Sequence, residues 1–236
     1  MASGIEKRLE SLTRKALYDY KMIDGPLKIA IALSGGKDSL TLLYMLKKIT
    51  GRGFPDFSIE AIHIAGEFSC GAGISLQFLH QVCQNLEVPL HIVTTTHEAK
   101  ECYSCSRDRR RHLFTKAKEI GATTIAFGHH RDDSIQTLLM NLLHKGEFAA
   151  NLPRVPMVHY GVTIIRPLIL ASEEEIIAFS KEKGYLRLTC QCPIGQNSLR
   201  RQVKDLLGEI EVLYPNAKTN LAYAGLTYGS HKALEP

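Results

Sequence analysis

The sequence predicts an α/β fold, a doubly wound parallel sheet with one helix ahead of it. Three observations support this prediction. Short apolar runs alternate with longer stretches of helical periodicity along most of the chain. The run Ile29–Leu33 is continuously apolar, as buried parallel strands are. Polar loops follow several of these runs, and ligands of such sheets bind beyond the carboxyl ends of the strands.

The first helical stretch lies before the sheet. Its apolar residues fall on one helical face, and its charged residues fall elsewhere: Ile5, Leu9, Leu12, Ala16, Leu17 and Tyr20. We expect this helix to pack on the main domain or on a second subunit of a homodimer. The predicted organisation is a leading helix in residues 1–25, the main α/β domain in residues 26–170, and a helical extension in residues 171–236.

The remaining elements follow from periodicity and from turn residues. Strands are expected at Lys28–Leu33, Ser58–Ile64, Pro89–Val93, Thr123–Phe127 and Val162–Ile165. Helices are expected at Leu40–Lys48, at Ile74–Leu86, within Glu101–Ile120, after Asp133 to about His144, at Ser172–Lys183 and at Asn197–Ile210. Ser172 and Glu175 have the spacing of a capping box. Residues 146–156 and the tail after the last helix are expected to be loops.

Composition limits the class of protein. Hydrophobic residues make up 44% of the 236 residues and charged residues 22%, as in ordinary soluble domains. The sequence contains no apolar run that could cross a bilayer and no signal peptide, so a cytoplasmic protein without a membrane partner is expected. The net charge of +5 suits an acidic partner. Six cysteines in a cytoplasmic chain favour metal binding or catalysis over disulfides.

The loop after the first strand has the composition of a phosphate site. Gly35 and Gly36 lack a Cβ, so an anion can approach their N–H groups closely. The helix that follows adds unpaired N–H donors and the positive end of its dipole. Lys37 adds a cation, and Ser34 and Ser39 add hydroxyls. The spacing is neither the Walker pattern nor the dinucleotide fingerprint.

A second polar segment, Gly128–Asp133, follows the fourth strand and opens a helix. Asp132 or Asp133 would cap that helix, or would hold Mg²⁺ on the phosphates of a nucleotide. His129 and His130 would contact the nucleotide or serve as hydrogen-bonded structure.

Cys102 and Cys105 have the spacing that lets two thiolates reach one metal. A further ligand would come from Cys70, Cys83, Cys190 or Cys192. A four-thiolate zinc site and a redox pair stay open as alternatives. Cys83 lies in an apolar helical pattern that favours core packing. The run of arginines at 107, 109, 110 and 111 is a solvated helix face or a phosphate contact.

Residues Ser34 to Ser39 read Ser-Gly-Gly-Lys-Asp-Ser, which resembles the PP-loop of ATP pyrophosphatases, proteins of the adenine nucleotide alpha hydrolase-like (HUP) fold. The full set of motifs resembles the tRNA 2-thiocytidine synthetase family. The other members of the set are Cys102–Arg111, Gly128–Asp133, Arg166–Leu168, and Cys190 with Gln196–Gln202. They occur in the family's order from the first helix to about Tyr214.

The resemblance implies an enzyme that adenylates a cytidine carbonyl of tRNA with ATP and Mg²⁺ and replaces its oxygen with sulfur from a 4Fe-4S cluster. The implied cluster ligands are Cys102, Cys105 and Cys190. The implied catalytic residues are Lys37, Asp38, Asp132 and Asp133. The implied nucleotide contacts are Ser34, Gly35, Gly36, Lys37, Asp38, Ser39, His63, Gly128, His129 and Arg166. The partners would be tRNA and a sulfur donor, either a cysteine desulfurase or inorganic sulfide.

The chain departs from the family pattern at two places. The last cysteine region reads Cys-x-Cys-Pro, which leaves Cys192 out of step, and residues 63–67 replace an acidic or amide-rich turn. Alternative functions are a lysidine synthetase-like PP-loop enzyme, which needs no cluster, and a cluster-dependent desulfurising or sensor protein.

Overall fold

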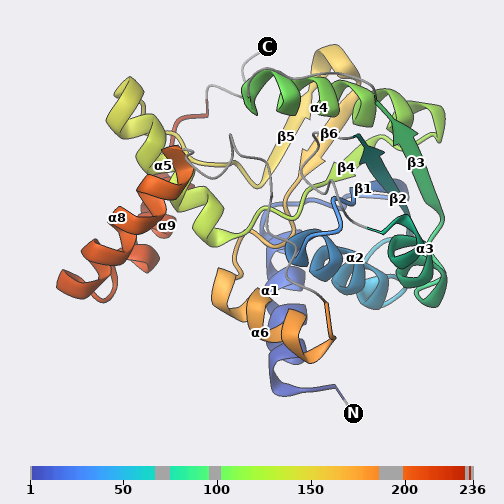
Figure 1. Cartoon of the computed structure of the whole chain (residues 1–236), viewed down its shortest axis with the longest axis horizontal. Helices are drawn as coiled ribbons and strands as arrows, with labels where there is room; N and C mark the ends of the chain where they lie inside the picture. Colours follow the sequence, from blue (N-terminus) through green and yellow to red (C-terminus); the bar gives the residue numbers. More distant parts are fainter. Residues whose placement is uncertain (1, 67–74, 96–101, 186–198, 232–233, 235–236) are drawn as a thin grey trace.

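The computed structural model describes residues 2–66, 75–95, 102–185, 199–231 and 234, without the side chains of residues 102–106. These residues form a six-stranded sheet in the order β3-β2-β1-β4-β6-β5 (Figure 1). All neighbouring strands are parallel except β5 and β6, which are antiparallel. The predicted doubly wound parallel sheet is therefore confirmed. Its strand order reverses at β1, between β2 and β4.

The strands are β1 Leu27–Ala32, β2 Phe57–Ala65, β3 Leu90–Thr94, β4 Thr124–Ala126, β5 Arg154–Met157 and β6 Val162–Ile165. The helices are α1 Gly4–Asp19, α2 Lys37–Ile49, α3 Leu76–Asn85, α4 Cys102–Glu119, α5 Arg131–Lys145, α6 Glu173–Glu182, α8 Leu199–Leu213 and α9 Ala217–Tyr228, with a short 3-10 helix at Val158–Tyr160.

Alternation along β1 separates two hydrophobic cores. Ile29, Ile31 and Leu33 point into a core shared with α1, α2, α3 and α6. Ala30 points to the other face, where Leu113 of α4 and neighbouring residues form the second core. Figure 1 shows α4 on one side of the sheet and α1, α2 and α6 on the other. Because both faces are covered, the central strands can be apolar throughout.

Two predictions from the sequence are wrong. Part of the expected loop at residues 146–156 belongs to β5, and the expected loop-rich tail contains α9. β5 is a short antiparallel edge strand that includes Pro156, which cannot donate a ladder hydrogen bond and so reads as a loop. The apolar residues of α9 run consecutively over residues 221–224, so they form no stripe at helical spacing.

The leading helix packs on the main domain of its own chain. Leu9, Ala16 and Leu17 of α1 are fully buried in the core shared with α2 and α6. The buried carboxylate of Glu6 adds polar contacts, because it pairs with Lys48 of α2 and lies 2.8 Å from the Lys183 ammonium group after α6. The apolar face of α1 is therefore covered within the chain.

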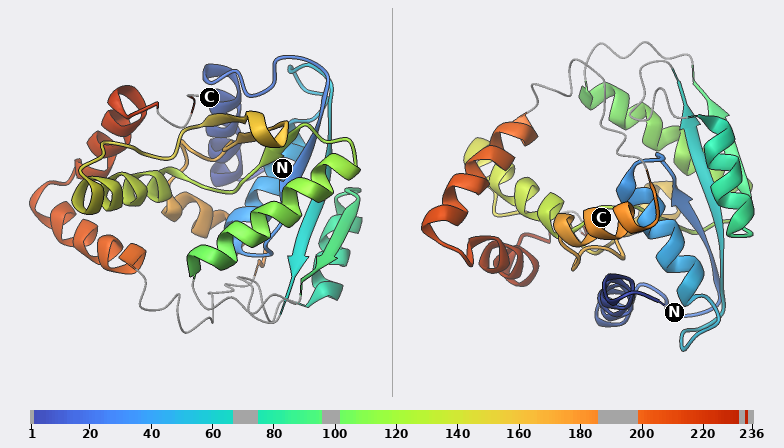
Figure 2. Two further views of the ribbon diagram at one scale, coloured as in Figure 1. Left: turned by 90° about the horizontal axis from the view of Figure 1, so that it is seen from above. Right: turned by 60° about the horizontal axis from the view of Figure 1, so that its bottom comes forward.

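Helices α8 and α9 pack on α5 beside the sheet, where Ile135, Leu139, Val203, Leu207 and Ala222 form a small third core. Both views of Figure 2 show this helical layer standing apart from the sheet. Within the described parts of the chain, none of the helices has the length and apolarity needed to cross a membrane.

Candidate active site

The loop after β1 is held by its own hydroxyl groups. Gly35 has a φ of +83°, a left-handed conformation that suits glycine. Its N–H donates to Ser39 Oγ at 3.1 Å, and Ser39 Oγ donates to the carbonyl of Gly36 at 3.0 Å. Ser34 Oγ lies 3.1 Å from Ser39 Oγ. The two serines therefore shape the loop before any ligand is bound.

The N-terminus of α2 contrasts with that of α6. Gly36, the N-cap of α2, makes no side-chain capping bond, so the first-turn N–H groups stay open to an anion. At α6, Ser172 and Glu175 form the predicted capping box, with bonds of 3.1 and 2.8 Å. Asp132 accepts a further bond from the Glu173 N–H at 2.8 Å. Of these two neighbouring helix N-termini, only that of α2 lacks a side-chain cap and so leaves its N–H groups available to a ligand.

Lys37 lies at this open end between two carboxylates. Its Nζ is 2.8 Å from Asp38 Oδ1 and 3.4 Å from Glu173 Oε1. Burial lowers the pKa of Lys37, but the Asp38 and Glu173 charges outweigh burial, so that the pKa is raised. The lysine is therefore a fixed cation beside the loop. Glu173 also pairs with Lys204 of α8 at 2.7 Å.

Gly128 brings the second polar segment against the first turn of α2. A Cβ at Gly128 would lie 2.9 Å from the carbonyl carbon of Asp38 and 3.0 Å from the N of Ser39. Only a glycine allows the two loops to approach this closely. The structure thus joins Ser34–Ser39 and Gly128–Asp133 in one site at the carboxyl ends of β1 and β4.

His130 is buried among three carboxylates. Its Nε2 lies 3.4 Å from Asp133 Oδ2 and 3.7 Å from Asp38 Oδ1, and its Nδ1 lies 3.9 Å from Asp132 Oδ2. Within the described residues, Nδ1 of His130 is buried without a hydrogen-bond partner. A buried polar atom without a partner is unusual and marks this imidazole as a candidate for a ligand contact.

Asp133 combines structural and electrostatic roles. Its Oδ2 accepts from the His130 N–H at 3.1 Å, which caps α5, and its Oδ1 pairs with Arg200 of α8 at 2.8 Å. Burial raises the pKa of Asp133, but the nearby His130, His129 and Arg200 outweigh burial and lower it. The carboxylate therefore stays ionised at the junction of α5 and α8.

His129 and Arg166 contact each other. The Arg166 Nε donates to His129 Nδ1 at 3.1 Å, and the ring of His129 stacks on Phe127 with centroids 5.5 Å apart. Burial, and then the charge of Arg166, lower the pKa of His129 to about 4, so this histidine is neutral. Arg166 also donates to the carbonyl of Leu152. Its pKa is lowered to about 10 by burial and then by the charge of Arg110.

His63 lies near the end of β2, next to the loop that follows β1. Its Nδ1 donates to the Leu33 carbonyl at 2.8 Å, which leaves Nε2 as the acceptor. Burial lowers the pKa of His63, and the charge of Arg109 adds to the effect. Arg109 and Arg110 of the predicted basic run thus act on two residues of the site, from α4.

Most of the cysteines that the sequence predicts as ligands lie outside the residues whose side chains the structure describes. Cys70, Cys190 and Cys192 lie outside the described residues, and Cys102 and Cys105 are described only as backbone in the first turn of α4. Cys83 is buried as a free thiol whose pKa is raised to about 11 by burial, as expected for core packing. Among the described residues, no group of three or more His, Cys, Asp or Glu could hold a metal ion.

Sequence reasoning missed two residues of this site. The sequence predicts Glu173 only as a residue in the first turn of a helix, yet its carboxylate pairs with Lys37. Gln136 had no assigned role, yet it is buried near Asp132. Gln136 follows Asp132 by four positions on α5, so helical spacing alone would have placed it on the same face.

Comparison with known proteins identifies the family. A family model described as a PP-loop domain matches residues 1–187. The tRNA-cytidine(32) 2-sulfurtransferase of Pelobacter propionicus is 34% identical over 230 residues, covering 92% of this chain and 84% of the relative. The protein of the same name from a Marinomonas species is 37% identical, covering 89% of this chain and 78% of the relative.

This chain belongs to the tRNA 2-thiocytidine synthetase family of PP-loop proteins. The predicted family and the predicted kind of enzyme are confirmed. Membership in the PP-loop family also implies ATP binding.

Solved structures support the PP-loop fold. The U34-tRNA thiolase NcsA of Methanococcus maripaludis, solved with its 4Fe-4S cluster, has a TM-score of 0.77 at 22% identity, covering 94% of this chain and 78% of that one. The NH3-dependent NAD synthetase of Campylobacter jejuni has a TM-score of 0.52 at 15% identity, covering 100% and 98% of the two chains. At these identities the likeness establishes the fold alone.

Proposed function

We propose that this PP-loop protein is an ATP-dependent tRNA thiolase, which activates the carbonyl of a cytidine by adenylation and replaces its oxygen with sulfur. The observation that supports this proposal most directly is the uncapped N-terminus of α2 with Lys37 beside it, in a chain whose relatives are tRNA-cytidine 2-sulfurtransferases. Such an end binds phosphates, as the first step of this reaction requires.

In the first step, the cytidine oxygen forms a bond to the α-phosphorus of ATP, and the bond from that phosphorus to the pyrophosphate oxygen breaks. The first-turn N–H groups of α2 and the ammonium group of Lys37 stabilise the charge on the departing pyrophosphate. Asp38 is partly exposed at this position and would bind Mg²⁺ together with the phosphates, since Mg²⁺ combines one or two carboxylates with phosphate oxygens. Asp132 and Asp133 hold the surrounding helix ends in place.

In the second step, sulfur attacks the activated carbon, and AMP leaves with the original oxygen. Adenylation is needed because the oxygen of a cytosine carbonyl is a poor leaving group. His129, which stays neutral, and Arg166 form a paired unit beside the loop and would orient the nucleotide. The tRNA is the acceptor, and the attacking sulfur is at the oxidation level of sulfide, so it comes either from inorganic sulfide or from the persulfide of a cysteine desulfurase after reduction by a two-electron donor.

The residues of the chain fit a 4Fe-4S cluster. Cys102 and Cys105 lie one turn apart at the start of α4, and thiolates are the ligands such clusters take. Cys102, Cys105 and Cys190 would hold it. The cluster would supply sulfur at an iron that has no protein ligand.

Cysteine variants test the sulfur step. Protein purified without oxygen is compared as wild type, Cys102→Ala, Cys190→Ala and the core control Cys83→Ala, by iron analysis and by mass analysis of tRNA nucleosides. We expect the first two variants to lose iron and 2-thiocytidine formation and to keep their fold, and Cys83→Ala to keep all three. Unchanged iron in Cys102→Ala or Cys190→Ala would contradict the ligand assignment. Lysine attached to cytidine, without iron in the wild type, would indicate a lysidine synthetase-like enzyme.

A further inference from the structure

A cavity of about 510 Å³ lies between α5, α6, α8 and α9. This volume is in the range of about 300–1,000 Å³ that ligand pockets occupy. Asp132 and Glu173 belong to its wall, and Glu173 Oε1 is 3.4 Å from the Lys37 ammonium group. The cavity is therefore separated from the nucleotide loop by one side chain. No step of the mechanism described above uses this space.

Gln136 is an uncharged polar residue that is buried at the wall of this cavity. It lines the wall and the residue is only 6% exposed, and its amide, which makes no side-chain hydrogen bond within the described residues, is not among the fully buried polar atoms, so the amide is open to the cavity. A side-chain amide offers two donors and an acceptor in one plane. The structure thus presents a planar hydrogen-bonding edge to the cavity, next to the candidate active site.

The rest of the lining indicates the kind of ligand. Leu207, Gly208 and Val212 provide an apolar wall suited to the faces of a flat ring. The charged lining residues are four carboxylates and two lysines: Asp132, Glu173, Asp205, Glu209, Lys204 and Lys218. The excess of carboxylates disfavours phosphate and other anions. A flat, uncharged group with hydrogen-bonding edges fits best, and a nucleobase has these properties.

We propose that this cavity binds the target cytosine of the tRNA, turned out of its stack, with the amide of Gln136 paired to the N3 and N4 edge of the base. The inference rests on the proposed function. An amide donates to N3 and accepts from N4, which leaves O2 free to react. The carboxylates of Asp205 and Glu209 have no ion-pair partner among the described residues. They would accept from the N4 amino group of cytosine and repel the O4 carbonyl of uracil.

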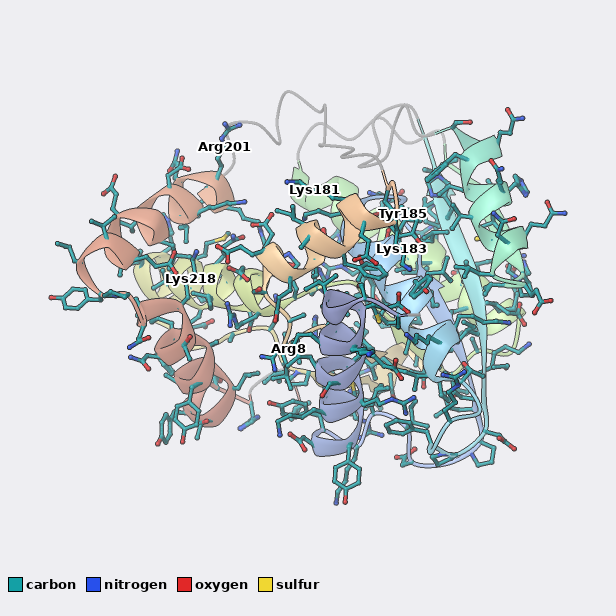
Figure 3. All side chains as sticks on the ribbon, turned by 90° about the horizontal axis from the view of Figure 1, so that it is seen from below. Arg8, Lys181, Lys183, Tyr185, Arg201 and Lys218 are labelled. Carbon is teal, nitrogen blue, oxygen red and sulfur yellow. The ribbon has the colours of Figure 1, made fainter. Side chains whose placement is uncertain are left out.

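The surface around the cavity suits an RNA strand. Figure 3 shows Lys181 of α6, Arg201 of α8 and Lys218 of α9 on one face of the molecule. Lys181 and Arg201 are exposed and have no ion-pair partner in the part of the chain that is described. Lysine and arginine side chains bind the phosphate backbone without regard to sequence. In the proposed complex, these cations would bind the RNA backbone, and the carboxylates that line the cavity would contact the base.

The test is equilibrium dialysis of the full-length protein with radiolabelled cytidine or uridine, which requires neither the cluster nor turnover. The wild type is compared with Gln136→Leu and with Gln84→Leu, a control at an exposed glutamine of α3. We expect Gln136→Leu to weaken cytidine binding about tenfold or more, in line with the value of a bidentate base contact. We expect uridine to bind the wild type at least about tenfold more weakly than cytidine, and Gln84→Leu to match the wild type.

A melting curve separates binding from a structural role. Because Gln136→Leu keeps the size of the side chain and removes no side-chain hydrogen bond seen within the described residues, it should leave the melting temperature close to that of the wild type. Cytidine binding that is absent in the wild type, unaffected by Gln136→Leu, or no stronger than uridine binding would overturn the proposal. A wild type that binds cytidine through Gln136 but forms no 2-thiocytidine in tRNA would overturn the proposed function and leave the cavity assignment in place.

Discussion

Helices α2 and α6 run side by side and carry a charged cluster at each end. The N-terminal cluster consists of Lys37, Asp38 and Glu173 with His130. The C-terminal cluster consists of Glu6, Lys48 and Lys183 with Tyr44. Both clusters include side chains of α2 and of the ends of α6, and both are partly buried. They differ in whether all of their polar groups have hydrogen-bond or ion-pair partners.

In the C-terminal cluster, both oxygens of Glu6 are paired. Oε1 accepts from Tyr44 at 3.1 Å and pairs with Lys48, and Oε2 pairs with Lys183 at 2.8 Å. In the N-terminal cluster, Nδ1 of His130 has no partner within the described residues, and the helix end has no side-chain cap. The comparison indicates that the satisfied cluster serves stability and that the unsatisfied one is kept for a ligand.

The largest expected difference is between the two lysines of α2. Lys37→Met should lower thiolation and pyrophosphate release by about a hundredfold or more, because in the proposed mechanism this cation stabilises the departing pyrophosphate, and it should change the unfolding free energy little. Lys48→Met should keep the activity and lower the unfolding free energy by about 2 kcal/mol, since it leaves Glu6 partly unpaired. Pyrophosphate assays and urea denaturation measure both. Loss of activity in both variants, or loss of stability in both, would contradict the comparison.

Gly128→Ala tests how closely the two loops of the active site must approach. The new Cβ would lie 2.9 Å from the Asp38 backbone, so the first turn of α2 must shift. We expect pyrophosphate release to fall at least about tenfold and stability to fall by about 1–3 kcal/mol. Gly4→Ala in α1, where a Cβ has nothing within 4 Å, is the matched control. An active Gly128→Ala variant would show that the packing of the loops is not critical.

The sequence predicted the features that depend on local signals better than those that depend on contacts between distant residues. Apolar runs located β1, β2, β4 and β6, and Ser172 with Glu175 located the start of α6, because these signals are local. The motifs also predicted that two separate loops meet, since parallel strands bring their carboxyl ends together. In the structure, the two loops meet where Gly128 lies against the first turn of α2.

The features that sequence reasoning missed depend on distant partners. The pairing of Glu173 with Lys37 joins residues 136 positions apart, and no pattern along the chain indicates it. Gln136 is polar but buried because α6, α8 and α9 close over it, which periodicity within α5 does not reveal. The positions of Cys70, Cys190 and Cys192 lie outside the described residues, so the predicted cluster ligands stay a prediction.

The pH dependence of the stability of Glu6→Gln tests the C-terminal cluster. Burial raises the pKa of Glu6, but its hydrogen bonds with Lys183 and Lys48 outweigh burial and lower the pKa from 4.5 to about 2. A lowered folded-state pKa contributes stability above pH 4.5 that is lost as the pH falls toward 2. We therefore expect the stability difference between wild type and Glu6→Gln to be largest near neutral pH and to shrink between pH 4.5 and pH 2. Urea denaturation at several pH values measures it, and a constant difference would argue against the paired state of Glu6.

Ser172→Ala, at the N-cap of α6, gives the smallest expected effect. Ser172 Oγ caps α6 by accepting from the Glu175 N–H at 3.1 Å, and Glu173 next to it reaches Lys37. Loss of the cap should cost about 1 kcal/mol of stability. Because Asp132 still binds the Glu173 N–H at 2.8 Å, we expect pyrophosphate release to fall less than about threefold. Ser172→Thr should keep the stability, since threonine retains the hydroxyl that accepts from the Glu175 N–H and donates to the Glu175 carboxylate. A large loss of activity with full stability would instead place Ser172 in contact with the nucleotide.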